Sequence, residues 1–245
     1  MSTILERLSN GGTVGVADLS RQLGVSAATV RRDLQLLQGQ RLLSRTHGGA
    51  VPQGVLYELP LRYKGARFHD EKRRIAAAVA ERIPDGAAVG LTGGTTTTEV
   101  ARALASRRLT VVTNALNIAS ELAVRPNLKL VVTGGVARAE SYELVGPLAE
   151  RSLEELNLDL VVLGVDGIDP EAGLTTHHEV EAHTNRALIE RAEHAVVVAD
   201  SSKIGRVAFA RICALSSVHE LVTDNAADPS MLRDIADAGV QITTV

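Results

Sequence analysis

The chain has 245 residues, of which 45% are hydrophobic and 22% charged, as in ordinary globular domains and unlike disordered segments. The single cysteine, Cys213, excludes an internal disulfide and a cysteine-built metal site, and it is expected to be a small buried hydrophobic residue. The sequence has no apolar run of about 18 residues and no basic stretch followed by an apolar one at its start. We therefore expect no membrane span, no signal peptide and a cytoplasmic protein.

The net charge of −3 hides an asymmetry along the chain. Residues 1–74 carry +6 (12 Arg/Lys against 6 Asp/Glu), whereas the remaining 171 residues carry −9 (14 against 23). A basic first module followed by an acidic body indicates that a surface for a polyanion lies near the front of the chain.

The first 50 residues show three short helical patterns. Ile4, Leu5 and Leu8 form an apolar stripe, and a second helix is predicted over 16–23. Gly24 ends that helix, and Ser26 is a suitable N-cap for a third. Two short helices joined by a tight glycine turn are typical of a helix-turn-helix.

The third helix has an apolar face formed by Val30, Leu34 and Leu37 and an opposite face that carries Arg32. Small residues lie near its start, so this face could enter the major groove of DNA without steric conflict. Two short strands are then predicted around His47-Gly48-Gly49, where glycine lets the backbone approach phosphate closely. We expect the DNA contacts to come from Ser26, Thr29, Arg31, Arg32, Gln35, Arg45, His47 and Gly48.

Two motifs in this module resemble those of the DeoR family of bacterial regulators. They are Thr29-Val-Arg-Arg-Asp-Leu34 and Leu43-Ser-Arg-Thr-His-Gly-Gly-Ala-Val51. The resemblance implies that the first motif belongs to a recognition helix and the second to the wing of a winged helix-turn-helix. The family's usual basic residues before the first helix are missing here.

The rest of the chain alternates strand and helix patterns. Residues 1–52 are predicted to form the DNA-binding domain, 53–73 a linker and 74–245 an α/β domain. Continuous β-branched runs separated by helical segments predict a mostly parallel, buried sheet. The strands are expected at 87–91, 109–113, 128–133, 160–165, 195–199, 220–223 and 240–243.

Polar residues follow most of these strands, at the sheet edge where α/β proteins bind ligands. A threonine run after Gly94 is predicted to open a helix, whose N-terminus would attract an anion. Lys203 and Arg138 could neutralise a phosphate, and Asp166 and Asn114 could hold sugar hydroxyls. The expected effector site comprises Gly94, Thr95, Thr96, Thr97, Thr113, Asn114, Gly134, Gly135, Arg138, Asp166 and Lys203.

Segments across about 75–225 also resemble the DeoR sensor domain, including Leu144-Val-Gly-Pro-Leu-Ala149, Gly164-Val-Asp-Gly-Ile-Asp169 and Ala199-Asp-Ser-Ser-Lys203. The resemblance implies a fold related to ribose-5-phosphate isomerase and effectors that are phosphorylated sugars or related metabolites. Two positions depart from the family pattern. Thr92 occupies a region where an acid is frequent, and Asn185 stands where a lysine is common.

Two other functions are compatible with parts of the sequence. Asp166-Gly-Ile-Asp169 is similar to a segment of the isomerase, but the Gly-Gly-Gly and Arg-Glu-Lys features that should follow it are absent. His177, His178, Glu179 and His183 could suggest a metal sensor, although their spacing is poor for one helical face. We therefore expect no catalysis, no metal and no other cofactor. The expected partners are double-stranded operator DNA, a sugar-derived effector and further copies of the chain in a dimer or tetramer. The resemblance to the DeoR family implies repression of a carbohydrate operon, although the sequence itself leaves repression and activation open.

Overall fold

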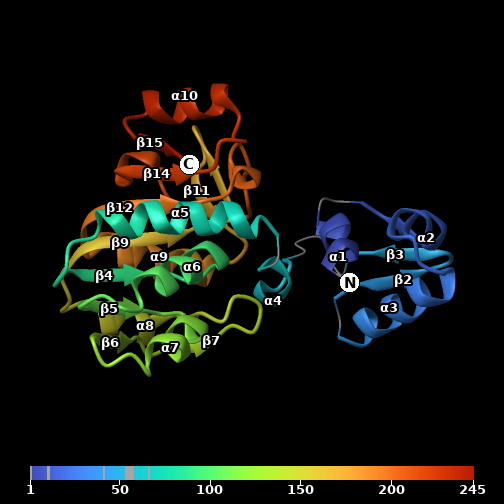
Figure 1. The fold of residues 1–245 in the computed structure, drawn as a ribbon, viewed down its shortest axis with the longest axis horizontal. Helices are drawn as coiled ribbons and strands as arrows, with labels where there is room; N and C mark the ends of the chain where they lie inside the picture. The colour runs from blue at the N-terminus through green and yellow to red at the C-terminus, as the bar shows by residue number, and fades with distance from the viewer. Residues whose placement is uncertain (1, 10–11, 41, 53–57, 66) are drawn as a thin grey trace. The chain divides into compact units, whose positions relative to one another are not determined.

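The computed structural model describes residues 2–9, 12–40, 42–52, 58–65 and 67–245 (Figure 1). The chain forms two compact units, Met1–Lys64 and Gly65–Val245. No helix in the described part of the chain is long and apolar enough to cross a membrane.

The smaller unit contains the three predicted helices, a small antiparallel sheet and one further short helix. The apolar faces of the helices and the sheet meet in one core, in which Ile4, Leu19 and Leu34 are buried. The elements are α1 (Ser2–Ser9), β1 (Val14–Gly15), α2 (Val16–Leu23), α3 (Ala27–Gly39), β2 (Ser44–Thr46), β3 (Gly49–Val51) and α4 (Leu61–Lys64).

The turn between α2 and α3 has the predicted chemistry. Gly24 adopts a left-handed conformation with φ of 63°, which ends α2. Ser26 caps α3, because its Oγ accepts the backbone N–H of Thr29 at 3.1 Å. The order of α2 and α3 and the glycine turn between them confirm the helix-turn-helix prediction.

The wing is a three-stranded antiparallel sheet in the order β1-β3-β2. Its third strand, β1, was not predicted, because a two-residue strand leaves no periodic signal. Gly49 lies so close to β1 that an added Cβ would stand 2.0 Å from the carbonyl oxygen of Val14. The Val16 N–H donates to the Gly48 carbonyl at 2.8 Å, which ties the hairpin to the start of α2.

The larger unit is built on a seven-stranded sheet in which all pairings are parallel, as predicted. The strand order is β15-β14-β12-β9-β4-β5-β6. Their bounds are β4 (Ala88–Leu91), β5 (Leu109–Thr113), β6 (Leu128–Val132), β9 (Leu158–Gly164), β12 (Ala192–Val198), β14 (Glu220–Thr223) and β15 (Gln241–Thr244).

Helices cover both faces of this sheet, so the strands are apolar on both sides. Val196 and Val198 of β12 pack with α5, α6 and α7, whereas Val197 packs with α8, α9 and α10 on the other face. The bounds are α5 (His69–Arg82), α6 (Thr95–Leu104), α7 (Leu116–Leu122), α8 (Pro147–Leu153), α9 (Glu179–Glu190) and α10 (Pro229–Asp237).

Helix α6 begins earlier than predicted, at Thr95 instead of Glu99. The threonine run is helical because the hydroxyls of Thr97 and Thr98 both donate to the Gly94 carbonyl, at 3.0 and 2.6 Å. Helices α4 and α5 both begin inside 53–73, the segment expected to be a linker, and residues 53–57 and 66 lie outside the described residues.

Two small antiparallel sheets and two short 3-10 helices were not predicted. One sheet pairs β7 (Val136–Ala137) with β8 (Leu144–Val145); the other has the order β10-β11-β13. The strands of the second sheet are β10 (Gly167–Asp169), β11 (Gly173–Thr176) and β13 (Ala210–Cys213), and the 3-10 helices are η1 (Ser201–Lys203) and η2 (Leu215–Ser217).

Candidate functional sites

Helix α3 presents a polar face opposite its buried stripe. Val30 and Leu34 are buried in the core of the smaller unit, and Arg31, Arg32 and Gln35 are exposed. Among the residues that the structure describes, neither arginine has an ion-pair partner. Both guanidinium groups are therefore available for guanine or phosphate, the acceptors that Arg binds bidentately.

The wing adds further exposed polar groups to this unit. Helix α3 contacts β2, and Arg45, His47 and Gly48 on or next to β2 are all exposed. Ser26 and Thr29 share a hydroxyl–hydroxyl hydrogen bond of 2.9 Å at the start of α3. The eight residues predicted to contact DNA thus belong to α3, its cap, or the wing, and all eight are exposed.

At the carboxyl edge of the parallel sheet, the N-terminus of α6 forms an anion-binding geometry. The first hydrogen bond of the helix joins the Thr98 N–H to the Gly94 carbonyl at 3.1 Å. The N–H groups of Thr95, Thr96 and Thr97 precede it and have no acceptor within the helix. Together with the positive end of the helix dipole, these groups favour a bound anion.

A buried carboxyl group, Glu143, lies directly beside this N-terminus. Its Oε1 accepts the Gly93 N–H at 2.8 Å and the Asn114 amide at 3.3 Å. The approach is so close that a Cβ on Gly93 would stand 2.4 Å from Glu143 Cγ. Burial, and then the neighbouring charge of Glu181, raise the pKa of Glu143 well above its usual range.

A second buried carboxyl, Glu181 of α9, continues the cluster toward Arg138 and Asp166. The Arg138 guanidinium and the Thr176 hydroxyl both contact the Glu181 carboxylate. The Thr176 hydroxyl also lies 3.2 Å from Asp166 Oδ2. Since this hydroxyl has one hydrogen, it donates to one carboxylate at a time.

The cluster ends at Lys203, which follows β12 on η1. Its Nζ lies 3.2 Å from Asp166 Oδ1, and His177 Nε2 lies 3.9 Å from the same oxygen. The Lys203 side chain is 23% exposed, whereas that of Asp166 is 11% exposed. The structure therefore brings Asn114, Arg138, Asp166 and Lys203 into one chain of polar contacts beside Gly94, and their binding of an effector stays a prediction.

Some of the expected effector residues have structural partners instead. The Thr113 hydroxyl donates to the Leu91 carbonyl at 2.7 Å and accepts the Ala115 N–H, so it is used inside the sheet. Gly134 donates its N–H to Ser152 on α8. A Cβ on Gly135 would stand 2.9 Å from the Val145 backbone, so this glycine is required for the close approach of β7 to β8.

Sequence reasoning missed Glu143, Thr176 and Glu181, which connect the predicted residues. Glu143 lies in an irregular segment whose contact with Gly93 spans 50 residues, so no local pattern marks it. Glu181 did carry a signal, because it lies on the face of α9 that also buries Ala182 and Leu188. A charged residue on a buried helical stripe indicates a specific partner.

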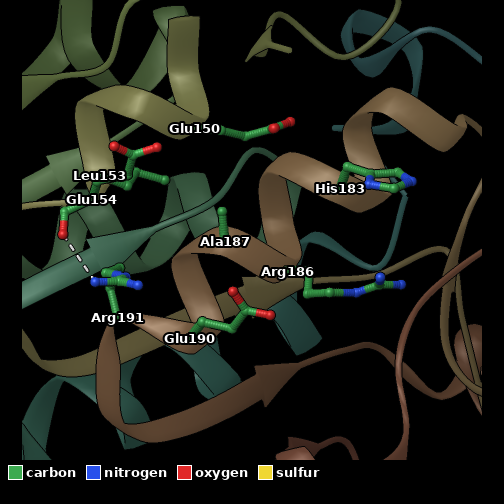
Figure 2. A pocket seen from close by; sticks show the side chains of 8 residues that line it. All are labelled: Glu150, Leu153, Glu154, His183, Arg186, Ala187, Glu190 and Arg191. Carbon is green, nitrogen blue, oxygen red and sulfur yellow. Dashed lines mark hydrogen bonds between the residues drawn. The ribbon is translucent and has the colours of Figure 1, made fainter. Parts of the chain in front are cut away.

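The histidines that were considered for a metal site contact different residues. His177 lies near Asp166, and the Nδ1 atom of His178 accepts the Val180 N–H to cap α9. His183 instead lines a separate groove between α8 and α9, as Figure 2 shows. The described residues contain no group of three or more His, Cys, Asp or Glu side chains that could hold a metal.

That groove has a volume of about 350 Å³ and a mixed-charge lining. Arg191 donates to the Glu154 carbonyl at 2.9 Å, the dashed line in Figure 2, and Arg186 donates to the Ile212 carbonyl at 2.6 Å. Both cations are thus partly used by backbone carbonyls. The residues of the expected effector site do not line this groove; it is lined by Glu150, Leu153, Glu154, His183, Arg186, Ala187, Glu190 and Arg191.

Two family models together match nearly the whole chain. The DeoR-like helix-turn-helix domain matches residues 1–53, and the DeoR C-terminal sensor domain matches residues 67–225. The boundary between the two matches falls in the region where the chain passes from the smaller unit to the larger one.

Curated relatives extend over almost the full length. The chain is 39% identical to the HTH-type transcriptional regulator GlpR of Haloferax volcanii, covering 98% of this chain and 94% of that protein. It is 34% identical to the glycerol-3-phosphate regulon repressor of Escherichia coli K12, covering 98% and 95%. It is 37% identical to the putative aga operon transcriptional repressor of Escherichia coli O157:H7, covering 99% and 91%.

Solved structures align with part of this chain at low TM-scores. Ribose 5-phosphate isomerase A from Methanocaldococcus jannaschii aligns with a TM-score of 0.42 and 19% identity, covering 56% of this chain and 54% of that one. A probable sor operon regulator from Shigella flexneri aligns with a TM-score of 0.43 and 12% identity, covering 69% and 90%. With both family models matched and full-length relatives above 30% identity, the chain belongs to the DeoR family of transcriptional regulators.

Proposed function

We propose that this regulator represses a carbohydrate catabolic operon and leaves its operator when a phosphorylated sugar or related metabolite binds the larger unit. Two of the relatives described above are named as repressors of the glycerol-3-phosphate regulon and the aga operon. The proposal assigns DNA recognition to the smaller unit and effector binding to the carboxyl edge of the sheet in the larger one.

One observation carries the effector half of the proposal: the polar cluster that runs from the N-terminus of α6 to Lys203. The helix N-terminus and Lys203 supply positive charge for a phosphate. Asn114 and Asp166 supply acceptors for sugar hydroxyls, and Asn114 Oδ1 is buried without a hydrogen-bond partner in the described structure. A ligand with a phosphate and several hydroxyls matches both parts of this donor and acceptor set.

In the DNA half, Arg31 and Arg32 contact bases or phosphates, and Gln35 lies one turn further along the same exposed face. The wing residues Arg45 and His47 contact the backbone. Because one such module rarely gives enough affinity alone, the chain acts as a homo-oligomer on repeated or palindromic half-sites. Effector binding shifts operator affinity by a coupling free energy of about 1–3 kcal/mol.

Two variants of the full-length chain, Arg32→Ala and Lys203→Ala, test DNA recognition and effector binding separately. Thermal shift with glycerol 3-phosphate, ribose 5-phosphate and glucose 6-phosphate, with inorganic phosphate and the free sugars as references, identifies stabilising ligands by mass action. Operator binding is measured on a duplex that the wild-type chain selects from a random library. We expect Arg32→Ala to lose roughly 5- to 150-fold in operator affinity, because a guanine or phosphate contact contributes about 1–3 kcal/mol.

The Arg32→Ala chain should keep the ligand-induced thermal shift, whereas Lys203→Ala should lose the shift and keep operator binding. Arg108→Ala and Lys129→Ala are matched controls, because both side chains are exposed on the larger unit away from the cluster. Wild-type operator affinity in Arg32→Ala would refute the recognition-helix assignment. An unchanged thermal shift in Lys203→Ala would remove Lys203 from the effector site.

A further inference from the structure

Lys72, the fourth residue of α5, is a buried cation that the functions described above do not use. Its side chain is 4% exposed. The ammonium donates to the Arg67 carbonyl at 2.5 Å and lies 3.9 Å from Asp200 Oδ2, whose side chain is also 4% exposed. A buried ion pair is a poor source of net stability, since its desolvation offsets much of the attraction. The segments that the Lys72–Asp200 pair connects are therefore more informative than its contribution to the free energy of unfolding.

On one side of Lys72 lies the turn that carries Lys203. Asp200 Oδ1 caps this turn by accepting the Ser202 N–H at 3.2 Å, and the Asp200 carbonyl accepts the Lys203 N–H at 2.9 Å. The Ser201 N–H donates to buried Asp224 at 2.6 Å. Asp200 and Lys203 thus belong to one rigid turn, with Asp200 facing Lys72 and Lys203 facing Asp166.

On the other side of Lys72 lies the start of the larger unit. Arg67 is separated from Lys64, the last residue of the smaller unit, by two residues. Phe68 has a φ of 52°, a left-handed conformation that is unfavourable for a bulky side chain. Lys72 holds this bend twice, because its own N–H donates to the Phe68 carbonyl at 2.9 Å while its ammonium bonds to the Arg67 carbonyl.

We propose that Lys72 is a positioning residue that links the Asp200–Lys203 turn to Arg67, the point where the chain enters the larger unit, and so makes operator affinity respond to a ligand held by Lys203. The inference rests on the effector site proposed above. A phosphate that binds Lys203 competes with Asp166 for the ammonium and displaces the turn. The displacement reaches Asp200, then Lys72, and then the backbone that leads to the smaller unit.

A purely stabilising ion pair predicts a different result from a positioning one. Loss of a stabilising contact lowers the melting temperature and leaves unchanged the ratio of operator affinities measured with and without ligand. Loss of a positioning contact reduces that ratio, because the ligand still binds but no longer alters the chain at Arg67. The ratio is therefore the discriminating quantity.

The first arm uses the full-length chain with Lys72→Met, which keeps an unbranched side chain one atom shorter and removes its charge. Lys129→Met is the matched control on the exposed edge strand β6. The probe is the member of the sugar phosphate panel that gives wild type its largest thermal shift. In wild type we expect this ligand to change operator affinity by roughly 5- to 150-fold. In Lys72→Met we expect the change to fall below about threefold, with the ligand still bound.

The second arm needs no ligand and measures amide hydrogen exchange across residues 67–73. Asp200→Asn keeps the acceptor that caps the turn and removes the charge that faces Lys72. If Asp200 positions Lys72, the exchange of this segment rises on the order of tenfold in Asp200→Asn and in Lys72→Met, and not in Lys129→Met.

Failure of the proposed role of Lys72 can be distinguished from failure of the proposed effector site. Ligand-dependent operator binding of wild-type size in Lys72→Met overturns the inference even if the effector site is correct. If no compound of the panel shifts the melting temperature of wild type, the effector proposal fails together with the claim that a ligand acts through Lys203, and the exchange arm then decides only whether Asp200 and Lys72 hold the backbone at Arg67. Unchanged exchange in Asp200→Asn overturns this link, and faster exchange confined to residues 67–73 in both variants supports it.

Discussion

Replacing Glu143 with glutamine should remove a pH dependence of stability that the buried carboxyl imposes. In the folded chain Glu143 accepts hydrogen bonds from Gly93 and Asn114 and lies beside Glu181. Burial and the charge of Glu181 raise the pKa of Glu143 well above its unfolded value. A glutamine keeps the same acceptor oxygen and offers an N–H toward Glu181, so it imitates the protonated acid without titrating.

The sign and size follow from proton linkage. The stability associated with a carboxyl of raised pKa is fully present below the unfolded pKa, about 4.3 for Glu, and is lost as the pH rises through the folded pKa. Within that window the folded state of wild type holds one proton more than the unfolded state. Its free energy of unfolding therefore falls by about 1.4 kcal/mol per pH unit relative to that of Glu143→Gln.

Urea denaturation followed by circular dichroism, from about pH 5 upward, measures this difference. Glu193→Gln is the control, because Glu193 is exposed on β12. Parallel curves for wild type and Glu143→Gln would show that Glu143 does not hold a proton in the fold. Parallel curves for wild type and Glu193→Gln are expected, because that side chain is solvated in both states.

The remaining predictions concern the smaller unit and the cysteine. Ser26→Ala should cost about 1 kcal/mol of stability by removing the cap of α3, seen as faster amide exchange in that helix. Gly49→Ala should abolish operator binding, since its Cβ would stand 2.0 Å from the Val14 carbonyl and force the wing apart; wild-type binding would contradict this packing. Burial raises the pKa of Cys213 to about 11, so iodoacetamide should label it at neutral pH only in denaturant, as mass spectrometry can show.

Much of the fold could be predicted because its strands are long and buried on both faces. Val196, Val197 and Val198 point alternately into two cores, so the strand is a continuous β-branched run that has no competing helical interpretation. The same logic located each strand of the parallel sheet to within a few residues. The turn at Gly24 and the cap at Ser26 were equally readable, because each depends on one residue's local chemistry.

The small antiparallel sheets could not be predicted, because their strands depend on distant partners. Strand β10 is Gly-Ile-Asp, a sequence typical of turns, and it becomes a strand by pairing with β11. Gly173 of β11 has a φ of 75° and lies so close to β13 that an added Cβ would stand 2.2 Å from the Cys213 carbonyl. Such close approaches are set by tertiary packing, which a periodicity argument does not include.

The candidate effector site was only half predictable for a related reason. Its rim follows the strands in sequence, so Asn114, Asp166 and Lys203 could be named from the order of the elements. The buried residues of the site lie on segments outside the parallel sheet: Glu143 precedes β8, and Glu181 lies on α9. A charged side chain on these segments would normally be predicted to be exposed, because burial of an unpaired charge is costly in free energy. Its place inside the site can be predicted only when the residue that pairs with it is known.

The buried charges inside this site account for the raised pKa of Glu143. Glu143 and Glu181 are both buried, and Arg138 is in direct contact with Glu181. Asn185 lies one helical turn after Glu181 on the buried face of α9, and its Oδ1 is buried without a described partner. Burial and the charge of Glu181 both disfavour the ionised form of Glu143, so its pKa is raised in a cluster where Arg138 contacts Glu181.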